Sequence, residues 1–317
     1  MYFPVANIEV NPLVPPLVAF AISFFTSMGG VSGAFLLLPF QVSVLGFTSP
    51  AVSSTNQLFN IVAIPSGVYR YIKEGRMLWP LTWVVIIGTL PGVLVGAIVR
   101  IKYLPDPKNF KLFAGLVLLY MGARLLKDLA LSKNKGDTPT TEELFHQRDK
   151  KQPRASGSEA TSSEYSSRVI VHQWTPTRIV YEFYGETLTV NCVGLMALSL
   201  VVGMVGGVYG IGGGAIIAPF LVSFFRLPIY TVAGASLMGT FVTSVAGVIF
   251  YQILAPHFPG MVIAPDWLLG FLFGIGGFAG MYCGARLQQF VPGGFIKWIL
   301  VVCLLFTAGT YIWSFLF

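Results

Sequence analysis

The chain has 317 residues, of which 55% are hydrophobic and only 10% are charged, and its formal net charge is +7. Roughly a quarter of the residues of an average globular protein are charged, so this composition excludes a soluble domain and indicates a membrane protein. The basic residues are dispersed at the ends of apolar runs and in one polar segment, which is not the footprint of a nucleic-acid surface. We therefore expect the lipid bilayer, and no nucleic acid, as a partner.

Apolar runs long enough to cross about 30 Å of hydrocarbon recur along the chain. The first, residues 12–45, carries a glycine cluster in its middle and follows an N-terminus with no basic residues, so we expect no cleaved signal peptide. A second glycine cluster lies at 206–214, in the sequence "GGVYGIGGGAIIAPF". The other runs are residues 50–69, 78–99, 112–124, 241–255, 267–285 and 298–317.

A polar segment divides the chain into a first membrane unit at 1–130, a linker at 131–185 and a second membrane unit at 186–317. The first part of the linker is rich in Ser, Thr, Lys and Glu, which is typical of disorder. The sequence "RVIVHQWTPTRIVYEFYGETLTV", which begins at Arg168, is β-branched and aromatic around a Thr-Pro turn. It predicts a small β-hairpin near the membrane, and the linker is expected to be cytoplasmic.

The two membrane units repeat each other. A shift of 180 positions aligns Gly33 with Gly213 and Pro39 with Pro219, and a shift of 188 aligns Gly92 with Gly280. Residues 12–45 are too many for one crossing, so we expect two helices joined at the glycines and five segments in each unit. An odd number of crossings in the first unit makes the second unit begin on the other side of the membrane, so the second copy is inverted. If the glycine-bearing pair does not cross fully, each unit has four crossings and the two copies are parallel. The prediction is an all-α polytopic membrane protein with two homologous repeats of four to five membrane helices, some of them interrupted by glycines.

The basic residues mostly agree with inversion under the positive-inside rule. The loop after residue 69 carries Arg70, Lys73 and Arg76, whereas its counterpart "APHFPGMVIAPDW" has no Lys or Arg, so the two loops are expected on opposite sides. The other basic residues expected inside are Arg226, Arg286 and Lys297. The exceptions, which this topology places outside, are Arg100, Lys102, Lys108 and Lys111.

The glycine cluster after residue 205 follows an apolar helix and has no Gly-Lys-Ser/Thr, so it is not a nucleotide-binding loop. Two interpretations remain: a place where helices pack closely, or an interrupted helix whose free N–H groups face a substrate. The related "GGVSGAFLLLPF" at 29–40 favours the second, since inverted symmetry brings both helix N-termini together at mid-membrane. A different pattern, glycines spaced four residues apart, indicates helix packing at Gly88, Gly92, Gly96, Gly276, Gly280 and Gly284.

Polar residues cluster in "SSTNQLFN" at 53–60, and Asn or Gln in hydrocarbon requires partners. No Asp, Glu, Lys or His lies in the middle of a predicted span, and the three cysteines lack metal-ligand spacing. We therefore expect no enzyme, no metal and no cofactor. N–H groups, hydroxyls and amides suit a small desolvated oxyanion. The predicted substrate-binding residues are Gly30, Ser32, Gly33, Thr55, Asn56, Gln57, Gly210, Gly212, Gly213, Gly214, Ser236 and Thr240.

The glycine clusters, "AGASLMGTFVTSVAGVIFY", "SSTNQLFNIVAIPSGVYRY", "EGRMLWP" and "GGFAGMYCGARL" together resemble the TauE/SafE family of sulfite and organosulfonate exporters. The resemblance covers nearly all of both apolar halves. It implies a multi-pass transporter in the plasma membrane, or the inner membrane if the source is bacterial, that exports small sulfur-containing anions such as sulfite, thiosulfate or sulfoacetate. It also implies that the glycine-rich turns and the Thr-Asn and Ala-Ser positions lie near the transport path.

Two alternatives stay open at this stage. One is an uptake permease for another small organic anion or a metal, and the other is a membrane scaffold or assembly protein without transport activity. The oligomeric state is also open, and a homo-oligomer is compatible with the sequence.

Overall fold

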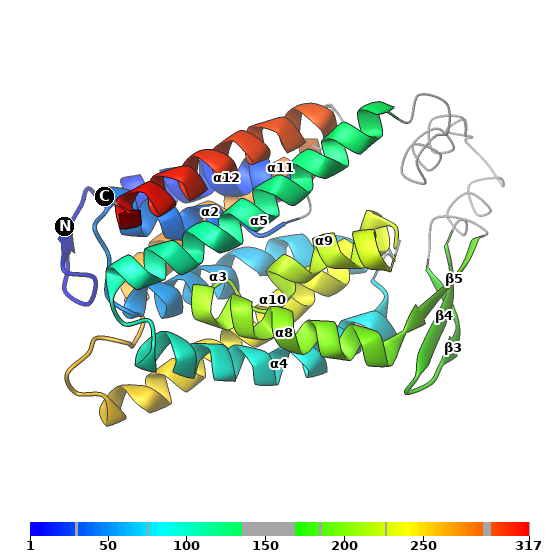
Figure 1. Ribbon diagram of the computed structural model, residues 1–317, viewed down its shortest axis with the longest axis horizontal. Helices are drawn as coiled ribbons and strands as arrows, with labels where there is room; N and C mark the ends of the chain where they lie inside the picture. The colour runs from blue at the N-terminus through cyan, green and yellow to red at the C-terminus, as the bar shows by residue number, and fades with distance from the viewer. Residues whose placement is uncertain are drawn as a thin grey trace.

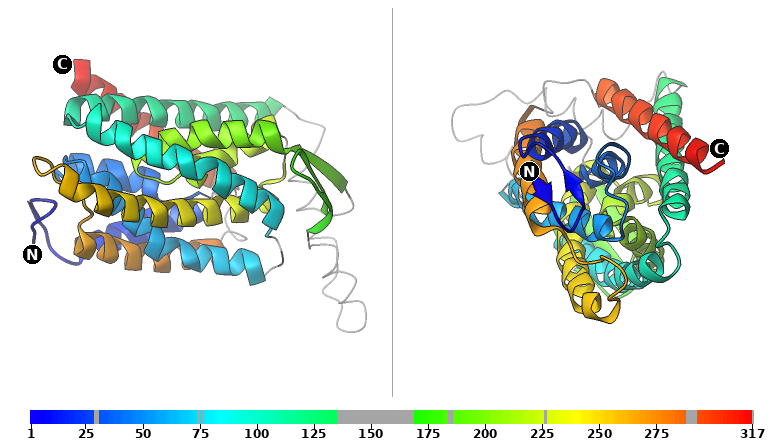
Figure 2. Two further views of the ribbon diagram at one scale, coloured as in Figure 1. Left: turned by 90° about the horizontal axis from the view of Figure 1, so that it is seen from below. Right: turned by 90° about the vertical axis from the view of Figure 1, so that its left-hand side faces the viewer.

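A computed structural model describes residues 1–28, 31–73, 75, 77–134, 169–183, 186–225, 227–287 and 293–316. The described part is mostly helical, and most helices lie roughly along the long axis of the molecule (Figure 1). Both chain termini lie at one end of this bundle, and a small β-sheet lies at the other. The views of Figure 2 show the same arrangement from below and from the end that carries the termini.

The described part of the first half contains a short N-terminal hairpin followed by helices. These elements are β1 (Tyr2–Phe3), β2 (Ile8–Glu9), α1 (Val14–Met28), α2 (Ala34–Pro39), the π-helical η1 (Phe40–Val44), α3 (Ala51–Lys73), α4 (Trp79–Lys102) and α5 (Pro107–Asn134). The hairpin of β1 and β2 was not predicted.

The second half opens with the sheet and repeats the helical segments in the same order. Its elements are β3 (Ile170–Trp174), β4 (Arg178–Phe183), β5 (Glu186–Asn191), α8 (Cys192–Tyr209), α9 (Gly214–Phe224), α10 (Ile229–Leu254), the 3-10 helix η2 (Ala255–His257), α11 (Trp267–Leu287) and α12 (Gly293–Leu316).

The predicted helix interruptions are confirmed at the described residues of both glycine clusters. Helix α1 ends five residues before Gly33, and α8 ends at Tyr209, before Gly210 and Gly212. Gly210 has φ +84° and Gly212 has φ +76°. Glycine has no Cβ atom and adopts this left-handed region without strain, so these residues end one helix and allow the next to begin in a new direction.

Within the described residues, six helices are long and apolar enough to cross a membrane: α4, α5, α8, α10, α11 and α12. Helix α3 also has 23 residues, but its polar cluster lowers its mean hydropathy. The first ten residues of α3, 51–60, are all buried, because neighbouring helices cover them instead of lipid. Large apolar side chains such as Trp83, Ile87, Phe271 and Ile275 are exposed on α4 and α11, as expected for surfaces that face hydrocarbon.

The glycines at four-residue spacing pack helices closely, as predicted. Helix α4 packs along α8, and α11 packs along α1. A Cβ atom at Gly92 would collide with the carbonyl oxygen of Leu200, and one at Gly280 would collide with that of Phe20. Phe20 and Leu200 are themselves related by the shift of 180, so corresponding glycines pack against corresponding backbone atoms.

The elements at the sheet end are connected by hydrogen bonds. The Val169 N–H donates to the Gly75 carbonyl oxygen at 3.4 Å, which joins the sheet to the loop after α3. The Tyr181 hydroxyl in β4 lies 3.1 Å from the Thr231 hydroxyl at the start of α10. Burial raises the pKa of Tyr181 to about 12, so its phenol stays neutral at physiological pH. The end of α3 and the start of α10 therefore lie at the same end of the molecule.

The opposite end carries the start of α3 and the loop between α10 and α11. The Ala51 N–H donates to the Val262 carbonyl oxygen at 3.0 Å. The Ala6 N–H approaches the Asp266 carboxylate at 3.4 Å, so the N-terminal segment lies there too. Helices α3 and α10 pack on each other and run in opposite directions.

The predicted hairpin is a three-stranded antiparallel sheet with the order β3-β4-β5, and all-α is therefore too narrow a description. The expected Thr-Pro turn connects β3 to β4, and buried Ile179, Tyr181 and Phe183 alternate with more exposed residues along β4. The sheet runs to Asn191, past residue 185, where the linker was expected to end. The predicted disordered stretch begins at Ser132, within the end of α5, and its residues 135–167 lie outside the described residues.

Candidate functional site

Two asparagines of α3 connect the two helix interruptions at the centre of the bundle. The Asn56 amide Nδ2 donates to the carbonyl oxygen of Ala34 at 2.9 Å and to that of Gly210 at 3.1 Å. One turn further along α3, the Asn60 Nδ2 donates to the Ile211 carbonyl oxygen at 3.0 Å. Gly210 and Ile211 follow the end of α8, and Ala34 begins α2, so the asparagine amides attach α3 to backbone groups of both interruptions.

Three further side chains complete a buried polar cluster. The Ser32 hydroxyl donates to Asn60 Oδ1 at 2.6 Å, and Asn60 Nδ2 also lies 3.3 Å from the Ser244 hydroxyl. The Gln41 Nε2 donates to Asn56 Oδ1 at 3.2 Å. We call Ser32, Gln41, Asn56, Asn60 and Ser244 the central polar cluster, and all five are fully buried.

The second interruption packs tightly against α10. The Gly213 N–H donates to the Thr243 hydroxyl at 3.1 Å, and the Thr240 hydroxyl donates to the Ser236 carbonyl oxygen at 2.8 Å. A Cβ atom at Gly214 would collide with that same Ser236 oxygen. The glycines therefore let the start of α9 approach α10 closely, and the Gly213 N–H has a protein partner.

A few polar groups near the centre have no hydrogen-bond partner. Gln57 is fully buried, and neither its amide nitrogen nor its amide oxygen is paired; the Gln41 amide oxygen and the Ser236 hydroxyl are also unpaired. The Gln57 amide fits against Gly247, where a Cβ atom would collide with it. An unpaired buried amide costs free energy, so these groups are available to a small polar ligand.

The central polar cluster consists of neutral amides and hydroxyls. Within the described residues, no group of three His, Cys, Asp or Glu side chains is placed to hold a metal ion. The arrangement can hold a small polar solute through hydrogen bonds and backbone dipoles, in a membrane interior where water is scarce.

Comparison with protein families matches residues 16–311 to the family described as sulfite exporter TauE/SafE. The chain belongs to this family. No curated protein and no solved structure matches it. With six membrane-capable helices in its described part, this TauE/SafE protein is a multi-pass protein of the plasma membrane, in a family of transporters for anions such as sulfite.

The structure brings together only some of the residues predicted for the site of this TauE/SafE protein. Ser32 and Asn56 belong to the central polar cluster, and Gln57 follows directly on α3. Thr55 lies elsewhere: its hydroxyl accepts the Asp266 N–H at 2.9 Å, in the loop before α11. Gly30 lies outside the described residues.

The glycine predictions have a mixed outcome. A Cβ atom at Gly33 would lie 2.9 Å from the Ser23 hydroxyl, and one at Gly212 would lie 2.9 Å from the Ser244 hydroxyl. A Cβ atom at Gly210 would collide with the backbone of Ser53. These glycines permit close packing around the interruptions, which is the first of the two interpretations of the glycine clusters.

The prediction missed Gln41, Asn60 and Ser244 as members of the site. A signal was available for Asn60, because residues four apart lie on one face of a helix and Asn56 was already selected. Ser244 and Gln41 were recognisable only as buried polar residues, since their partners come from distant segments of the chain.

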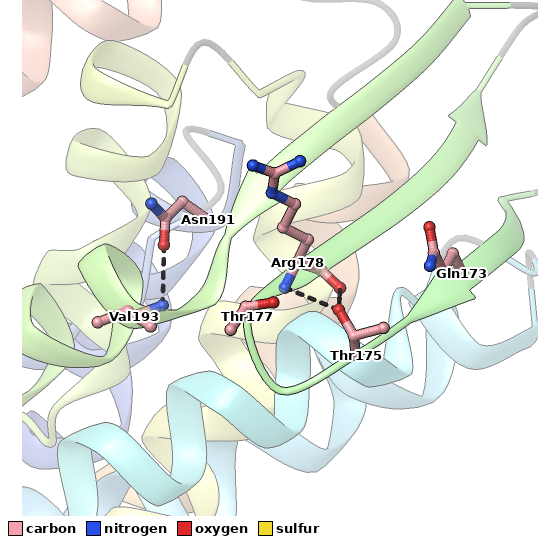
Figure 3. Close-up of a pocket in the computed structure, with 6 residues that line it drawn as sticks. All are labelled: Gln173, Thr175, Thr177, Arg178, Asn191 and Val193. Atoms are coloured by element: carbon pink, nitrogen blue, oxygen red, sulfur yellow. Dashed lines mark hydrogen bonds between the residues drawn. The ribbon is translucent and has the colours of Figure 1, made fainter.

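A pocket of about 610 Å³ lies at the sheet end of this TauE/SafE protein (Figure 3). It is lined by Gln173, Thr175, Thr177, Arg178, Asn191 and Val193. Thr175 and Arg178 bond to each other in the β3–β4 turn, and Asn191 caps α8 by accepting the Val193 N–H at 3.0 Å. These contacts stabilise a turn and the start of α8, and the second interruption lies at the other end of that helix.

Proposed function

We propose that this protein exports sulfite or a related small sulfur-containing anion, such as thiosulfate or sulfoacetate, through the centre of its helix bundle. The observation that supports this most is the central polar cluster, which bridges both interrupted helices inside a membrane protein of a sulfite exporter family. Polar groups at mid-membrane are costly, and in transporters such groups at interrupted helices form substrate sites.

We propose Ser32, Asn56, Gln57, Asn60 and Ser236 as the groups that contact the anion. Their amides and hydroxyls donate hydrogen bonds to oxyanion oxygens, and Gln57 and Ser236 have unpaired atoms for this purpose. Thr240 and the glycines at 33, 210, 212, 213 and 214 keep the interrupted turns in place. Neutral donors hold an anion without an ion pair that would have to be broken at each release.

We also propose that the two halves are inverted copies. In support, α3 and α10 pack in opposite directions, and corresponding residues make corresponding contacts. Gln57 lies against Gly247, whereas its counterpart Leu237 lies 3.4 Å from a Cβ atom placed at Gly67, the counterpart of Gly247. Inverted halves allow alternating access by a similar motion of each half around one central site.

Export agrees with the electrical driving force. A membrane potential that is negative inside favours outward movement of an anion by roughly 2.3 kcal/mol per elementary charge per 100 mV. Since 1.4 kcal/mol corresponds to a tenfold concentration ratio, a potential of 100 mV can sustain about a fiftyfold outward concentration gradient of a monoanion. Coupling to a proton is therefore unnecessary.

The test is flux into and out of proteoliposomes, measured in parallel for sulfite, thiosulfate, sulfate and sulfoacetate, with protein-free liposomes as the control. We expect faster flux than in the control for at least one sulfur-containing anion. Flux equal to the control for all four anions, from protein that is folded and reconstituted, would contradict the proposal and favour a scaffold.

A further inference from the structure

Arg100 is a buried cation in the last turn of α4, at the end of the molecule opposite the sheet. The predicted inverted topology places it outside with Lys102, as an exception to the positive-inside rule. The two residues differ in the structure: Lys102 is exposed, whereas Arg100 is fully buried. A buried guanidinium at this position needs an explanation other than contact with water.

The contacts of Arg100 leave part of its guanidinium unpaired. Its Nη1 donates to the Leu104 carbonyl oxygen, its Nε lies 3.4 Å from the Ser53 hydroxyl, and its Cζ lies 3.8 Å from the centre of the Phe110 ring. The Nη2 is buried without a hydrogen-bond partner. Among the described residues, no carboxylate lies within ion-pair distance of Arg100. The positive charge is therefore not neutralised by a described side chain.

A second unpaired group lies beside it. Tyr251 of α10 is fully buried and packs with Ala97, Ile101 and Ile263, around the same turn of α4 that carries Arg100. The Tyr251 hydroxyl lies near Arg100 and Ser53 but makes no hydrogen bond of standard length and angle. The Arg100 Nη2 and the Tyr251 hydroxyl, one of them part of a charged group, are therefore both buried without a standard hydrogen bond.

Ser53 connects this pair of donors to the second helix interruption. Its hydroxyl lies 3.4 Å from the Val208 carbonyl oxygen, in the last turn of α8. Its backbone also touches Gly210 so closely that a Cβ atom there would collide with it. Gly210 in turn contacts Asn56 of the central polar cluster. A short chain of contacts therefore leads from Arg100 to the proposed substrate site.

We propose that Arg100 and Tyr251 form a second anion-binding site, at the end of the transport path opposite the sheet. The ligand class is a small oxyanion with at least two acceptor oxygens, one for the Arg100 Nη2 and one for the Tyr251 hydroxyl. The anion supplies the missing negative charge and is then passed to or received from the central polar cluster. This inference rests on the proposed function for the identity of the anion.

The experiment compares Arg100→Gln and Tyr251→Phe with the control Lys102→Gln, which removes one charge from the same end at an exposed position. Sulfite binding to purified full-length protein is measured by thermal stabilisation at constant ionic strength, with chloride replacing sulfite, and sulfite flux is measured in proteoliposomes. We expect Arg100→Gln to raise the Kd for sulfite about tenfold or more and Tyr251→Phe to raise it severalfold. Lys102→Gln should leave the Kd within about twofold.

The outcomes separate this inference from the proposed function. If wild-type protein binds sulfite without transporting it and both variants lose binding, the second site stands and the transport proposal fails. If wild-type protein transports sulfite and the folded variants match Lys102→Gln in Kd and flux, the second site is wrong. Should Arg100→Gln fail to fold, Tyr251→Phe decides by the same criterion, because it removes one hydroxyl and keeps the ring packing. A wild-type protein that neither binds nor transports sulfite overturns both.

Discussion

Gln57→Leu separates a transport role from a structural role for the unpaired amide at the centre. The repeat supplies the substitution, because the position that corresponds to Gln57 is Leu237, which packs near Gly67 as Gln57 packs against Gly247. Leucine is therefore expected to fit. The Gln57 amide is fully buried with both polar atoms unpaired, so its removal relieves a desolvation cost of about 1–3 kcal/mol.

Gln57→Leu is expected to stabilise the protein but to weaken anion binding. A hydrogen bond to a charged group contributes about 1.5–3 kcal/mol, which is about 10- to 150-fold in binding if 1.4 kcal/mol is tenfold. We therefore expect Gln57→Leu to raise the melting temperature in detergent by a few degrees and to reduce sulfite flux in proteoliposomes at least tenfold. Leu237→Met serves as the matched control, since it changes the shape of the corresponding apolar contact at little cost. A stabilised Gln57→Leu protein with unchanged flux would refute the assignment of Gln57 to the substrate site.

Three further predictions concern packing, topology and energetics. Gly92→Ala should abolish folding because its Cβ would collide with the Leu200 carbonyl, whereas Gly309→Ala, with open space around it, should be neutral or stabilising by about 0.5–1 kcal/mol; thermal unfolding measures both. Lys73→Cys and His257→Cys should be labelled by an impermeant thiol reagent from opposite sides of the membrane, and labelling from one side would exclude the inverted arrangement. Sulfite flux should follow an imposed potassium-diffusion potential, and flux that ignores the potential but requires a pH gradient would mean that a proton accompanies the anion.

The sequence was sufficient for features that depend on local backbone chemistry. A glycine cluster inside an apolar run interrupts a helix wherever it occurs, so both interruptions were predictable. The stripe that contains Gly92 was also predictable, since residues four apart share a helix face and small residues let helices approach. The third strand, β5, was missed as a separate strand, although the alternating "ETLTVN" after the Tyr-Gly pair carries a strand signal.

Features that depend on distant contacts were not predictable in the same way. Arg100 near a helix end looks like a residue that extends to the membrane surface, and only its neighbours on α3, α5 and α10 bury it. Thr55 looked like part of the polar cluster because it precedes Asn56. Adjacent residues on a helix point about 100° apart, however, and the Thr55 hydroxyl meets Asp266 instead.

The hydrogen bonds at the centre also constrain how an anion can move through the bundle. Asn56 and Asn60 donate to carbonyl groups from both interruptions, so their amides already have protein partners. An oxyanion that accepts these N–H groups must displace the carbonyls, which releases the start of α2 and the end of α8 from α3. Binding would then be coupled to motion of the interrupted helices by competition for the same donors. This coupling needs asparagine, because an amide can donate to a carbonyl in one state and to the anion in the other, whereas an apolar residue could do neither.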